Sequence, residues 1–361
     1  MQTAIPCLIF RGGTSKGLYF HAKDLPADPK LRDQVLLAAI GSPDPRQIDG
    51  MGGADSLTSK VAILSPPSRP DADIDYLFLQ VSVAEALVSD RQNCGNILAG
   101  VGPYAIETGL LPATGEHTDV RIFMRNTDGL ATAKIQNPGG RVNYAGDCRI
   151  DGVPGASAPI PITFADVAGS SCGALLPTGN AMDVIEGVEV TLIDNGMPVV
   201  VVRAADLGVR GDEPPAELEA NATLRAKVEA IRLKAGRLMN LGDVTNATVP
   251  KVTLVSPPTA GGALSTRSFI PHTVHKAIGV FGAVSVATAA CLPGSVAASV
   301  AVLPDTGGEL TVSVEHPTGE FTALLTRSPE GEVVSAALLR TARLLMAGQV
   351  FVPAAVWDGR P

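Results

Sequence analysis

Two short apolar segments of the same kind constrain the fold more than any other feature of the chain. Gly95-Asn-Ile-Leu-Ala-Gly100 is followed by Leu111-Pro112. Gly282-Ala-Val-Ser-Val-Ala287 is followed by Leu292-Pro293. Each segment begins at a glycine, continues with small apolar residues and ends before a Leu-Pro pair, where a helix stops. A helix that is apolar on all sides must be buried. We therefore expect two similar lobes, each wrapped around one buried helix.

The sequence around these helices predicts short strands joined by Gly- and Pro-rich turns. Strands are expected over residues 4–10, 18–20, 60–64, 74–83, 120–125, 130–135, 188–193, 199–202, 251–255, 296–303, 310–314 and 321–325. Helices are expected over residues 29–40, 94–108, 216–239 and 282–290. Asp28 should cap the first helix, and Pro103 should end or kink the second. The pattern as a whole predicts an α+β fold.

We place the boundary between the lobes in the Gly- and Pro-rich stretch 137–161. This gives an N-terminal lobe over residues 1–145 and a C-terminal lobe over residues 146–361, with the last strands free to return to the first lobe. A ligand is expected between the lobes, near both helix starts, because domain interfaces commonly hold binding sites.

Charge and cysteine content exclude several classes of protein. The net charge is -8 and no basic run is present, so nucleic acid is not an expected partner. The cysteines are Cys7, Cys94, Cys148, Cys172 and Cys291. They form an odd set without CxxC spacing, which argues against a disulfide framework and against a zinc site. A reducing cytoplasm is the expected compartment, and no apolar region precedes Arg11 as a signal peptide would require.

An uncharged stretch over residues 277–304 is long enough to span a bilayer. Glycines and prolines interrupt it, and its last part is rich in Val and Ala. A buried helix followed by a buried strand therefore fits better than a membrane span.

The segment Arg91-Gln-Asn-Cys-Gly-Asn96 places one thiol between two amides at the first helix start. Exposed peptide N–H groups and the positive end of the helix dipole stabilise a thiolate there. The glycine lets a ligand approach the backbone closely. A buried structural cysteine is the alternative for an isolated thiol, but these neighbours favour an acid–base role for Cys94.

Several motifs together carry a family resemblance. They are Arg11-Gly-Gly-Thr-Ser-Lys-Gly17, Gly52-Gly-Ala-Asp-Ser-Leu-Thr-Ser-Lys60, Asn93-Cys-Gly-Asn96, Pro177-Thr-Gly179 and Thr191-Leu-Ile-Asp-Asn-Gly-Met-Pro198. On these motifs the chain resembles, over nearly its whole length, the PrpF-like family of cofactor-free isomerases, which has the diaminopimelate epimerase fold.

The segment from Arg267 to Val286 narrows the resemblance. It is similar to the 4-oxalomesaconate tautomerase/isomerase branch, which serves bacterial gallate and related aromatic degradation. Other relatives act on methylaconitate, aconitate or methylitaconate. The resemblance implies a small tricarboxylate substrate and no cofactor. No metal is expected, and a homodimer is the candidate assembly.

The chain departs from the epimerases of the same fold in one informative way. Those enzymes carry a thiol at each of the two helix starts, whereas the second start here is Gly279-Val-Phe-Gly282. The resemblance supplies the second proton carrier as Lys60. We expect Lys60 to act as the base, which requires a neutral amine that burial favours, and Cys94 to act as the partner acid. The opposite assignment stays open.

Removing a proton next to a keto group also requires groups that hold the carboxylates and stabilise the enolate. Helix starts and glycine turns offer peptide N–H donors for this purpose. Arg267 would clamp a carboxylate, and the two histidines would donate to a carboxylate or to the enolate. The expected substrate-binding residues are Gly12, Gly13, Thr14, Ser15, Ser59, Asn93, Gly95, Asn96, Arg267, His272, His275 and Gly282.

These assignments have alternatives. Lys16 is the alternative base to Lys60. The alternative for Arg267 is a surface position without contact to the substrate. His272 and His275 have a spacing that metal ligands use, but no third ligand matches it. The activity is expected to be keto–enol tautomerisation of 4-oxalomesaconate. The alternatives are a 1,3-allylic shift of its double bond, the same chemistry on methylaconitate or aconitate, and a carboxylate-binding protein without catalysis.

Overall fold

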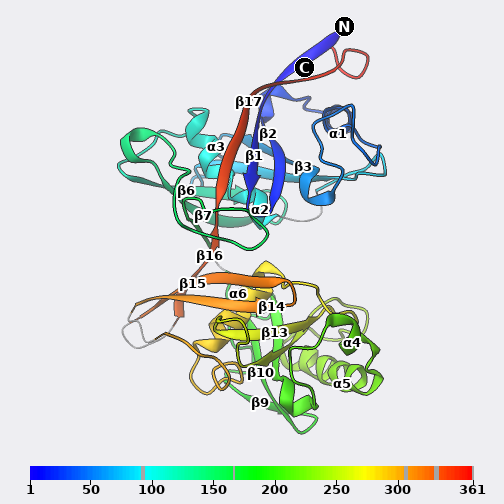
Figure 1. The fold of residues 1–361 in the computed structure, drawn as a ribbon, viewed down its shortest axis with the longest axis vertical. Coiled ribbons are helices and arrows are strands. Elements are labelled where there is room, and N and C mark those ends of the chain that lie inside the picture. Colours follow the sequence, from blue (N-terminus) through cyan, green and yellow to red (C-terminus); the bar gives the residue numbers. More distant parts are fainter. Residues whose placement is uncertain (91–93, 166, 305–307, 329–332, 360–361) are drawn as a thin grey trace. The chain divides into compact units, whose positions relative to one another are not determined.

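The computed structural model describes residues 1–90, 94–165, 167–304, 308–328 and 333–359. The chain forms two compact units, one of Met1–Ala165 with Leu339–Pro361 and the other of Asp166–Leu338 (Figure 1). The division therefore differs from the boundary expected at residue 145. The strand Ile160–Phe164 belongs to the first unit because it pairs with the strand Gly129–Gln136. The C-terminal strand Ala342–Pro353 belongs there because it pairs with the first strand of the chain.

One mixed sheet forms the frame of the first unit. Its strands run in the order β17 (Ala342–Pro353), β1 (Gln2–Gly12), β2 (Ser15–His21), β3 (Lys60–Ser65), β4 (Ile74–Val81), β6 (His117–Met124), β7 (Gly129–Gln136) and β8 (Ile160–Phe164). The short β5 (Val88–Ser89) pairs with the end of β4. The pairs β2–β3 and β4–β6 are parallel, and the other pairs are antiparallel.

Helices cover both faces of this sheet. On one face, α1 (Pro29–Ile40) buries Val35, Leu36, Ala39 and Ile40 against side chains of β1, β2, β3, β4 and β17. On the other face lie α2 (Gly95–Leu98) and α3 (Val101–Glu107), which contact β1, β2, β3, β6 and β7. Successive side chains of a strand point to opposite faces. In β3 this alternation turns Val61 and Ile63 toward α1 and Lys60 toward α2.

The second unit repeats this arrangement. Its strands are β9 (Asp183–Ile185), β10 (Val188–Asp194), β11 (Pro198–Arg203), β12 (Lys251–Ser256), β13 (Leu264–Phe269), β14 (Glu309–His316), β15 (Gly319–Arg327) and β16 (Val333–Arg340), which ends in the first unit. Its helices are α4 (Pro215–Ala220), α5 (Ala222–Leu238) and α6 (Val280–Ala290). Short 3-10 helices lie at Ala22–Asp24, Ser56–Thr58, Pro138–Gly140 and Ala204–Leu207.

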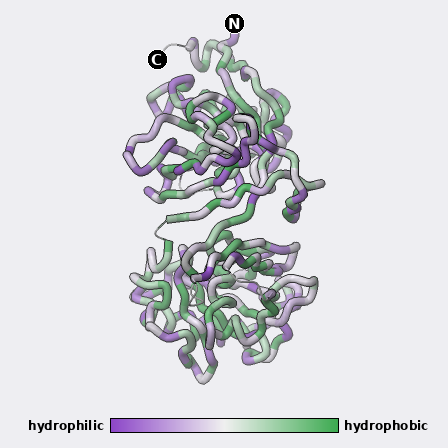
Figure 2. The backbone as a smooth tube through the Cα atoms, turned by 90° about the vertical axis from the view of Figure 1, so that its left-hand side faces the viewer, coloured by the Kyte–Doolittle hydropathy of each residue, from purple (hydrophilic) through white to green (hydrophobic). Residues whose placement is uncertain are grey.

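The two units share one connectivity. Each has a hairpin, a parallel crossover through an outer helix, an antiparallel pair, a second parallel crossover through a buried helix and a closing hairpin. The outer helices are α1 and α5, and the buried helices are α2 with α3 and α6. Figure 2 shows hydrophobic segments running through both units, as buried strands require. The α+β fold of two similar lobes, each around a central helix, is confirmed.

Within the helices and strands that were predicted, local structure differs from the prediction at three places. The helix expected over residues 94–108 is broken at residues 99–100, and Pro103 lies in the first turn of α3, where its missing N–H costs nothing. The helix expected over residues 216–239 is divided at Asn221, whose side chain caps α5 by accepting from the Leu224 N–H. The strand expected over residues 296–303 is wrong: these residues form tight turns, in which the Ala301 N–H donates to Ala297 O.

The other caps and turns follow the sequence closely. Asp28 caps α1 by accepting from the Leu31 N–H, and the strands β6 and β7 form the expected hairpin. In the described part of the chain, the apolar stretch after residue 277 forms α6 and turns, and no helix has the length and hydropathy needed to cross a membrane.

Candidate active site

The first turn of α2 lies directly on the sheet because two glycines leave room for it. A Cβ atom at Gly12 would lie 2.3 Å from the carbonyl oxygen of Asn96. A Cβ atom at Gly17 would lie 2.7 Å from Lys60 O and 3.1 Å from Ile97 Cδ1. These distances are too short for any side chain, so the close approach of α2 to β1 and β2 depends on glycine at both positions.

Two buried tyrosines of the sheet hold the backbone of α2. The Tyr19 hydroxyl donates to Ile97 O at 2.5 Å, and the Tyr76 hydroxyl lies 3.5 Å from Cys94 O. Burial raises the pKa of both phenols well above the ordinary value, and a negative charge at Cys94 raises it further. Both hydroxyls therefore stay protonated and act as donors that fix the start of the helix.

Cys94 differs from the other cysteines of the chain in its surroundings. It precedes α2 with extended backbone and is half-buried. Burial raises the pKa of Cys7 to about 11, and burial together with Asp194 raises the pKa of Cys172 to about 12. Burial also raises the pKa of Cys148 and Cys291. A thiol is nucleophilic and basic only as the thiolate, so burial disfavours acid–base work at these four cysteines. The position of Cys94 directly before α2 makes it the candidate.

Asn96 links three segments around Cys94. Its Nδ2 donates to Thr14 Oγ1 at 2.9 Å, and its Oδ1 accepts from Arg340 Nε at 3.1 Å. Its side chain also fills the space above Gly13, where a Cβ atom would lie 2.1 Å from Asn96 Oδ1. Packing against Asn96 therefore explains why residues 12 and 13 of the β1–β2 turn are glycines. Contact of Gly12 and Gly13 with a substrate stays a prediction.

Arg340 is a residue that the sequence reasoning missed. Burial lowers its pKa to about 10, and the charge of Cys94 opposes that shift. A partly buried guanidinium therefore stands close enough to Cys94 to stabilise a negative charge there. The sequence shows only an arginine within the largely apolar segment 333–346. Its partner Asn96 lies more than two hundred residues earlier in the chain, so the sequence gives no sign of the contact.

Lys60 lies on the same face of the sheet as α2. It is 6% exposed, and its Nζ donates to Gln80 Oε1 at 2.6 Å and stands 5.2 Å from the centre of the Phe78 ring. Phe78 and Gln80 alternate with residues that face α1, so they share this face with Tyr76. Since Tyr76 contacts the Cys94 carbonyl, the structure brings Lys60 and Cys94 to one face of one sheet.

The comparisons with known proteins extend over the same residues. Residues 2–353 match the family described as PrpF protein. The chain is 65% identical to the (4E)-oxalomesaconate Delta-isomerase of Novosphingobium sp. (strain KA1), over 96% of this chain and 97% of that protein. It is 60% identical to the 4-oxalomesaconate tautomerase of Pseudomonas putida, over 99% of both chains. The chain belongs to the PrpF family.

The crystal structure of a methylitaconate-delta-isomerase has the same fold as this PrpF protein. The TM-score is 0.87 at 39% identity, with 98% of this chain and 97% of that chain covered. Similarity of this extent covers both units and the segment around α2, so the family resemblance predicted from the motifs is confirmed.

Two serines predicted to bind substrate differ in their surroundings. Ser15 is 2% exposed, and its hydroxyl has no hydrogen-bond partner among the residues that the structure describes. A buried hydroxyl without a partner is costly, which supports a ligand contact for Ser15. The Ser59 hydroxyl lies 2.9 Å from Gln47 Oε1 and 2.8 Å from Asp55 O, so it holds the loop before β3.

Lys16, the competing base, is placed differently from Lys60. Lys16 is two residues before Leu18 in β2, so both side chains are on the face that packs on α1. A Cβ atom at Gly53 would lie 3.4 Å from Lys16 Nζ. The amine of Lys16 therefore lies beside the loop before β3, and this placement supports Lys60 as the base in the PrpF protein. The remaining predicted residue of this segment, Asn93, lies outside the described residues.

In the second unit, the guanidinium of Arg267 donates hydrogen bonds to main-chain carbonyls. Its Nε donates to Glu213 O, its Nη1 to Thr266 O and its Nη2 to Asp212 O, at 2.7 to 2.8 Å. Burial lowers its pKa, and the charges of Asp212 and Glu213 oppose that shift. These bonds give Arg267 a structural role, and its role as a carboxylate clamp stays a prediction.

The two predicted histidines have separate environments. The side chain of His272 is 63% exposed, with Nδ1 3.8 Å from Glu229 Oε2. His275 is half-buried, and its Nδ1 accepts from the Ala277 N–H at 2.9 Å. Burial, and to a lesser extent Lys251, lowers the pKa of His275, so its ring is neutral and carries a proton on Nε2 that can be donated. Among the described residues, no cluster of three or more His, Cys, Asp or Glu side chains is placed to hold a metal.

Gly282 offers a direct test of its predicted substrate contact. A Cβ atom there would lie 3.9 Å from Ile278 Cγ1, so the variant Gly282→Ala fits without strain. Alanine favours a helix over glycine by about 1 kcal/mol, so the melting temperature should rise by about 2–4 °C. If a substrate carboxylate approaches this backbone, KM should rise at the same time by about tenfold. An unchanged KM in the stabilised variant would remove Gly282 from the site.

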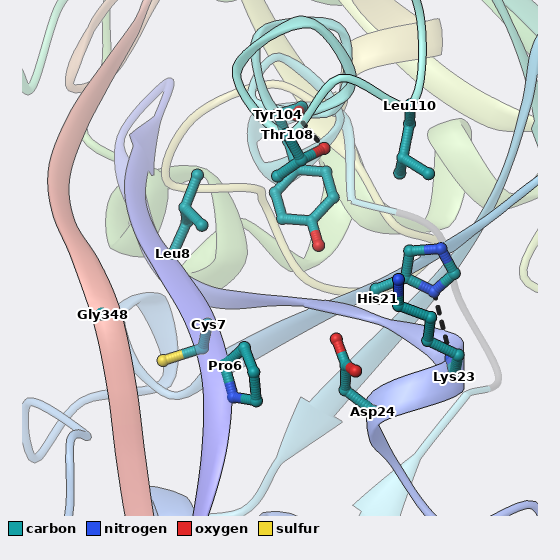
Figure 3. Close-up of a pocket in the computed structure, with 10 residues that line it drawn as sticks. All are labelled: Pro6, Cys7, Leu8, His21, Lys23, Asp24, Tyr104, Thr108, Leu110 and Gly348. Carbon is teal, nitrogen blue, oxygen red and sulfur yellow. Dashed lines mark hydrogen bonds between the residues drawn. The ribbon is translucent and has the colours of Figure 1, made fainter.

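A hollow of about 170 Å³ in the first unit lies apart from these residues (Figure 3). It is lined by Pro6, Cys7, Leu8, His21, Lys23, Asp24, Tyr104, Thr108, Leu110 and Gly348. Its thiol, Cys7, is kept protonated by burial, and the ring of His21 accepts from the Lys23 N–H through Nδ1. The hollow contains neither Lys60 nor Cys94, so it is not the acid–base site.

Proposed function

We propose that this PrpF protein is a cofactor-independent isomerase that converts keto 4-oxalomesaconate to its enol by proton transfer at carbon. The observation that carries the proposal is identity of 60–65%, over nearly the whole chain, to relatives named for reactions of this compound. The presence of Lys60 and Cys94 on one face of the first unit supports it, because the reaction needs two proton carriers.

In the proposed reaction, the amine of Lys60 acts as the base and removes a proton from the carbon beside the keto group. The electrons of that C–H bond form the enolate double bond, and the carbonyl oxygen takes the negative charge. Cys94 supplies a proton to complete the product. Donors fixed in the protein, such as the Ser15 hydroxyl and peptide N–H groups near Gly95, would lower the barrier by stabilising this charge.

The relative with 65% identity is named a Delta-isomerase, and this favours a second candidate reaction. In that reaction the proton returns to a distal carbon, and the C=C bond moves by a 1,3-allylic shift. Both reactions use the same base and differ in where the proton returns.

Proton NMR of the reaction in heavy water separates the two candidates. We expect the enol product with loss of the proton beside the keto group and no deuterium at a distal carbon. Deuterium at a distal carbon of the product would establish the allylic shift. If neither product forms from 4-oxalomesaconate while methylaconitate or aconitate reacts, the substrate assignment is wrong. Tight binding of tricarboxylates without exchange at carbon would mean a binding protein.

The remaining assignments are proposals of the same kind. We place the enzyme in the bacterial cytoplasm, in the degradation of gallate and related aromatic compounds, and we propose a homodimer. Sedimentation equilibrium tests the homodimer, and growth of a deletion strain on gallate tests the pathway.

A further inference from the structure

We propose that Gln80 is a positioning residue that orients the amine of Lys60 toward the substrate without fixing its charge. The inference rests on the proposed role of Lys60 as a base. Lys60 and Gln80 are direct partners in the antiparallel pair of β3 and β4, so their side chains lie next to each other on one face.

The orientation of the Gln80 amide is set by the carbonyls around it. Its Nε2 lies 3.1 Å from Ser56 O, 3.1 Å from Ser59 O and 3.3 Å from Val81 O. A carbonyl oxygen accepts only, so the NH2 group must face these atoms. The Oε1 atom is thereby left on the other side, where it accepts from Lys60 Nζ at 2.6 Å.

The loop that supplies two of these carbonyls is itself held in place. Gln47 is 2% exposed, and its Oε1 accepts from the Ala54 N–H at 2.7 Å and lies 2.9 Å from Ser59 Oγ. The carbonyls that orient Gln80 are therefore fixed by the same loop that leads into Lys60. This gives the network the rigidity that a catalytic amine needs.

A neutral acceptor suits a base better than a carboxylate does. An amide oxygen accepts one N–H of either a neutral amine or an ammonium, and so leaves the lone pair of the neutral amine to point elsewhere. A carboxylate in the same place would stabilise the ammonium by an opposite charge, which typically shifts a titration by 1–3 pH units. The amide therefore directs Lys60 and leaves it able to lose its proton.

The test compares Gln80→Glu with Gln80→Met. In Gln80→Glu we expect kcat at neutral pH to fall by about a hundredfold and the acidic limb of the pH–rate profile to move upward by about one unit or more, because the new carboxylate holds the ammonium. In Gln80→Met we expect a similar loss of kcat with no upward movement of the limb. Gln34→Glu, on the exposed side of α1, is the matched control for the added charge.

A spectroscopic readout separates this proposal from the proposed function. The ¹⁵N resonance of Lys60 Nζ, assigned by its loss in Lys60→Met, should titrate at higher pH in Gln80→Glu than in wild type, whatever the substrate is. Melting curves identify any variant that fails to fold. If the folded Gln80→Glu protein has a wild-type rate profile and a wild-type ¹⁵N titration, Gln80 does not position Lys60. If only the ¹⁵N titration moves, Lys60 and Gln80 are coupled but Lys60 is not the base, and the proposed function needs another one.

Discussion

Lys60→Met and Cys94→Ser are each expected to lower kcat by about 10²- to 10⁴-fold, the range that a positioned general acid or base contributes. Methionine matches the lysine side chain up to the ε position and removes only the amine, and serine is close in size to cysteine and removes the thiol. Neither change leaves a cavity, so the folded state should persist. Steady-state kinetics on 4-oxalomesaconate, with melting curves for both variants, measure the effect.

Matched controls exist for both variants. Lys16→Met removes the lysine on the α1 face of the sheet. Cys148→Ser removes a half-buried thiol, and burial raises the pKa of that thiol. Both controls should keep near-wild-type kcat. Iodoacetamide should inactivate the enzyme by labelling Cys94, and substrate should slow that labelling. Full labelling of Cys94 with surviving activity would show that the thiol is dispensable.

Gly12→Ala is also expected to lower kcat strongly, although glycine carries no reactive group. The new Cβ atom would collide with main-chain atoms of Asn96, which cannot rotate away as a side chain can. Overpacking of this kind costs about 1–3 kcal/mol of stability. It also pushes the start of α2, and with it Cys94, away from the sheet. A shift of about 1 Å in a catalytic group can cost about a hundredfold in rate.

The prediction for Gly12→Ala is checked by kinetics and thermal unfolding together. Gly279→Ala is the control, because a Cβ atom at Gly279 meets no atom within 4 Å and its φ is -69°. We expect a loss of kcat of about a hundredfold for Gly12→Ala and a change of less than threefold for the control. A Gly12→Ala enzyme with wild-type kcat would show that α2 can move without cost, contrary to the packing described above.

The sequence predicted much of the fold because its strongest signals are local. The buried helices, the Asp28 cap and the β6–β7 hairpin follow from periodicity and from the preferences of glycine, aspartate and proline, which act over a few residues. The stretch 296–303 was mistaken for a strand because Val and Ala are common in strands and in buried turns alike. The strands β8 and β17 were missed because long-range pairing makes them strands. The three-residue strand β9 pairs locally with β10 across a tight turn and was missed because it is so short. The strands β5 and β16 were also not predicted.

The sequence predicted less of the candidate site than of the fold. Cys94 and Lys60 lie in motifs that the family resemblance carries. Arg340 and Gln80 have no such local signal, because each is defined by a contact across the sheet or across the whole length of the chain. The glycines of the β1–β2 turn were expected to cradle a substrate, whereas the structure gives them a packing reason, which a sequence pattern does not distinguish.

Exchange of the substrate proton in heavy water tests the two-carrier mechanism most directly. Mass spectrometry of recovered 4-oxalomesaconate should show that Cys94→Ser still exchanges the proton beside the keto group while forming little product. Lys60→Met should neither exchange the proton nor form product. Wild-type exchange by Lys60→Met would contradict the assignment of this amine as the group that takes the proton from carbon.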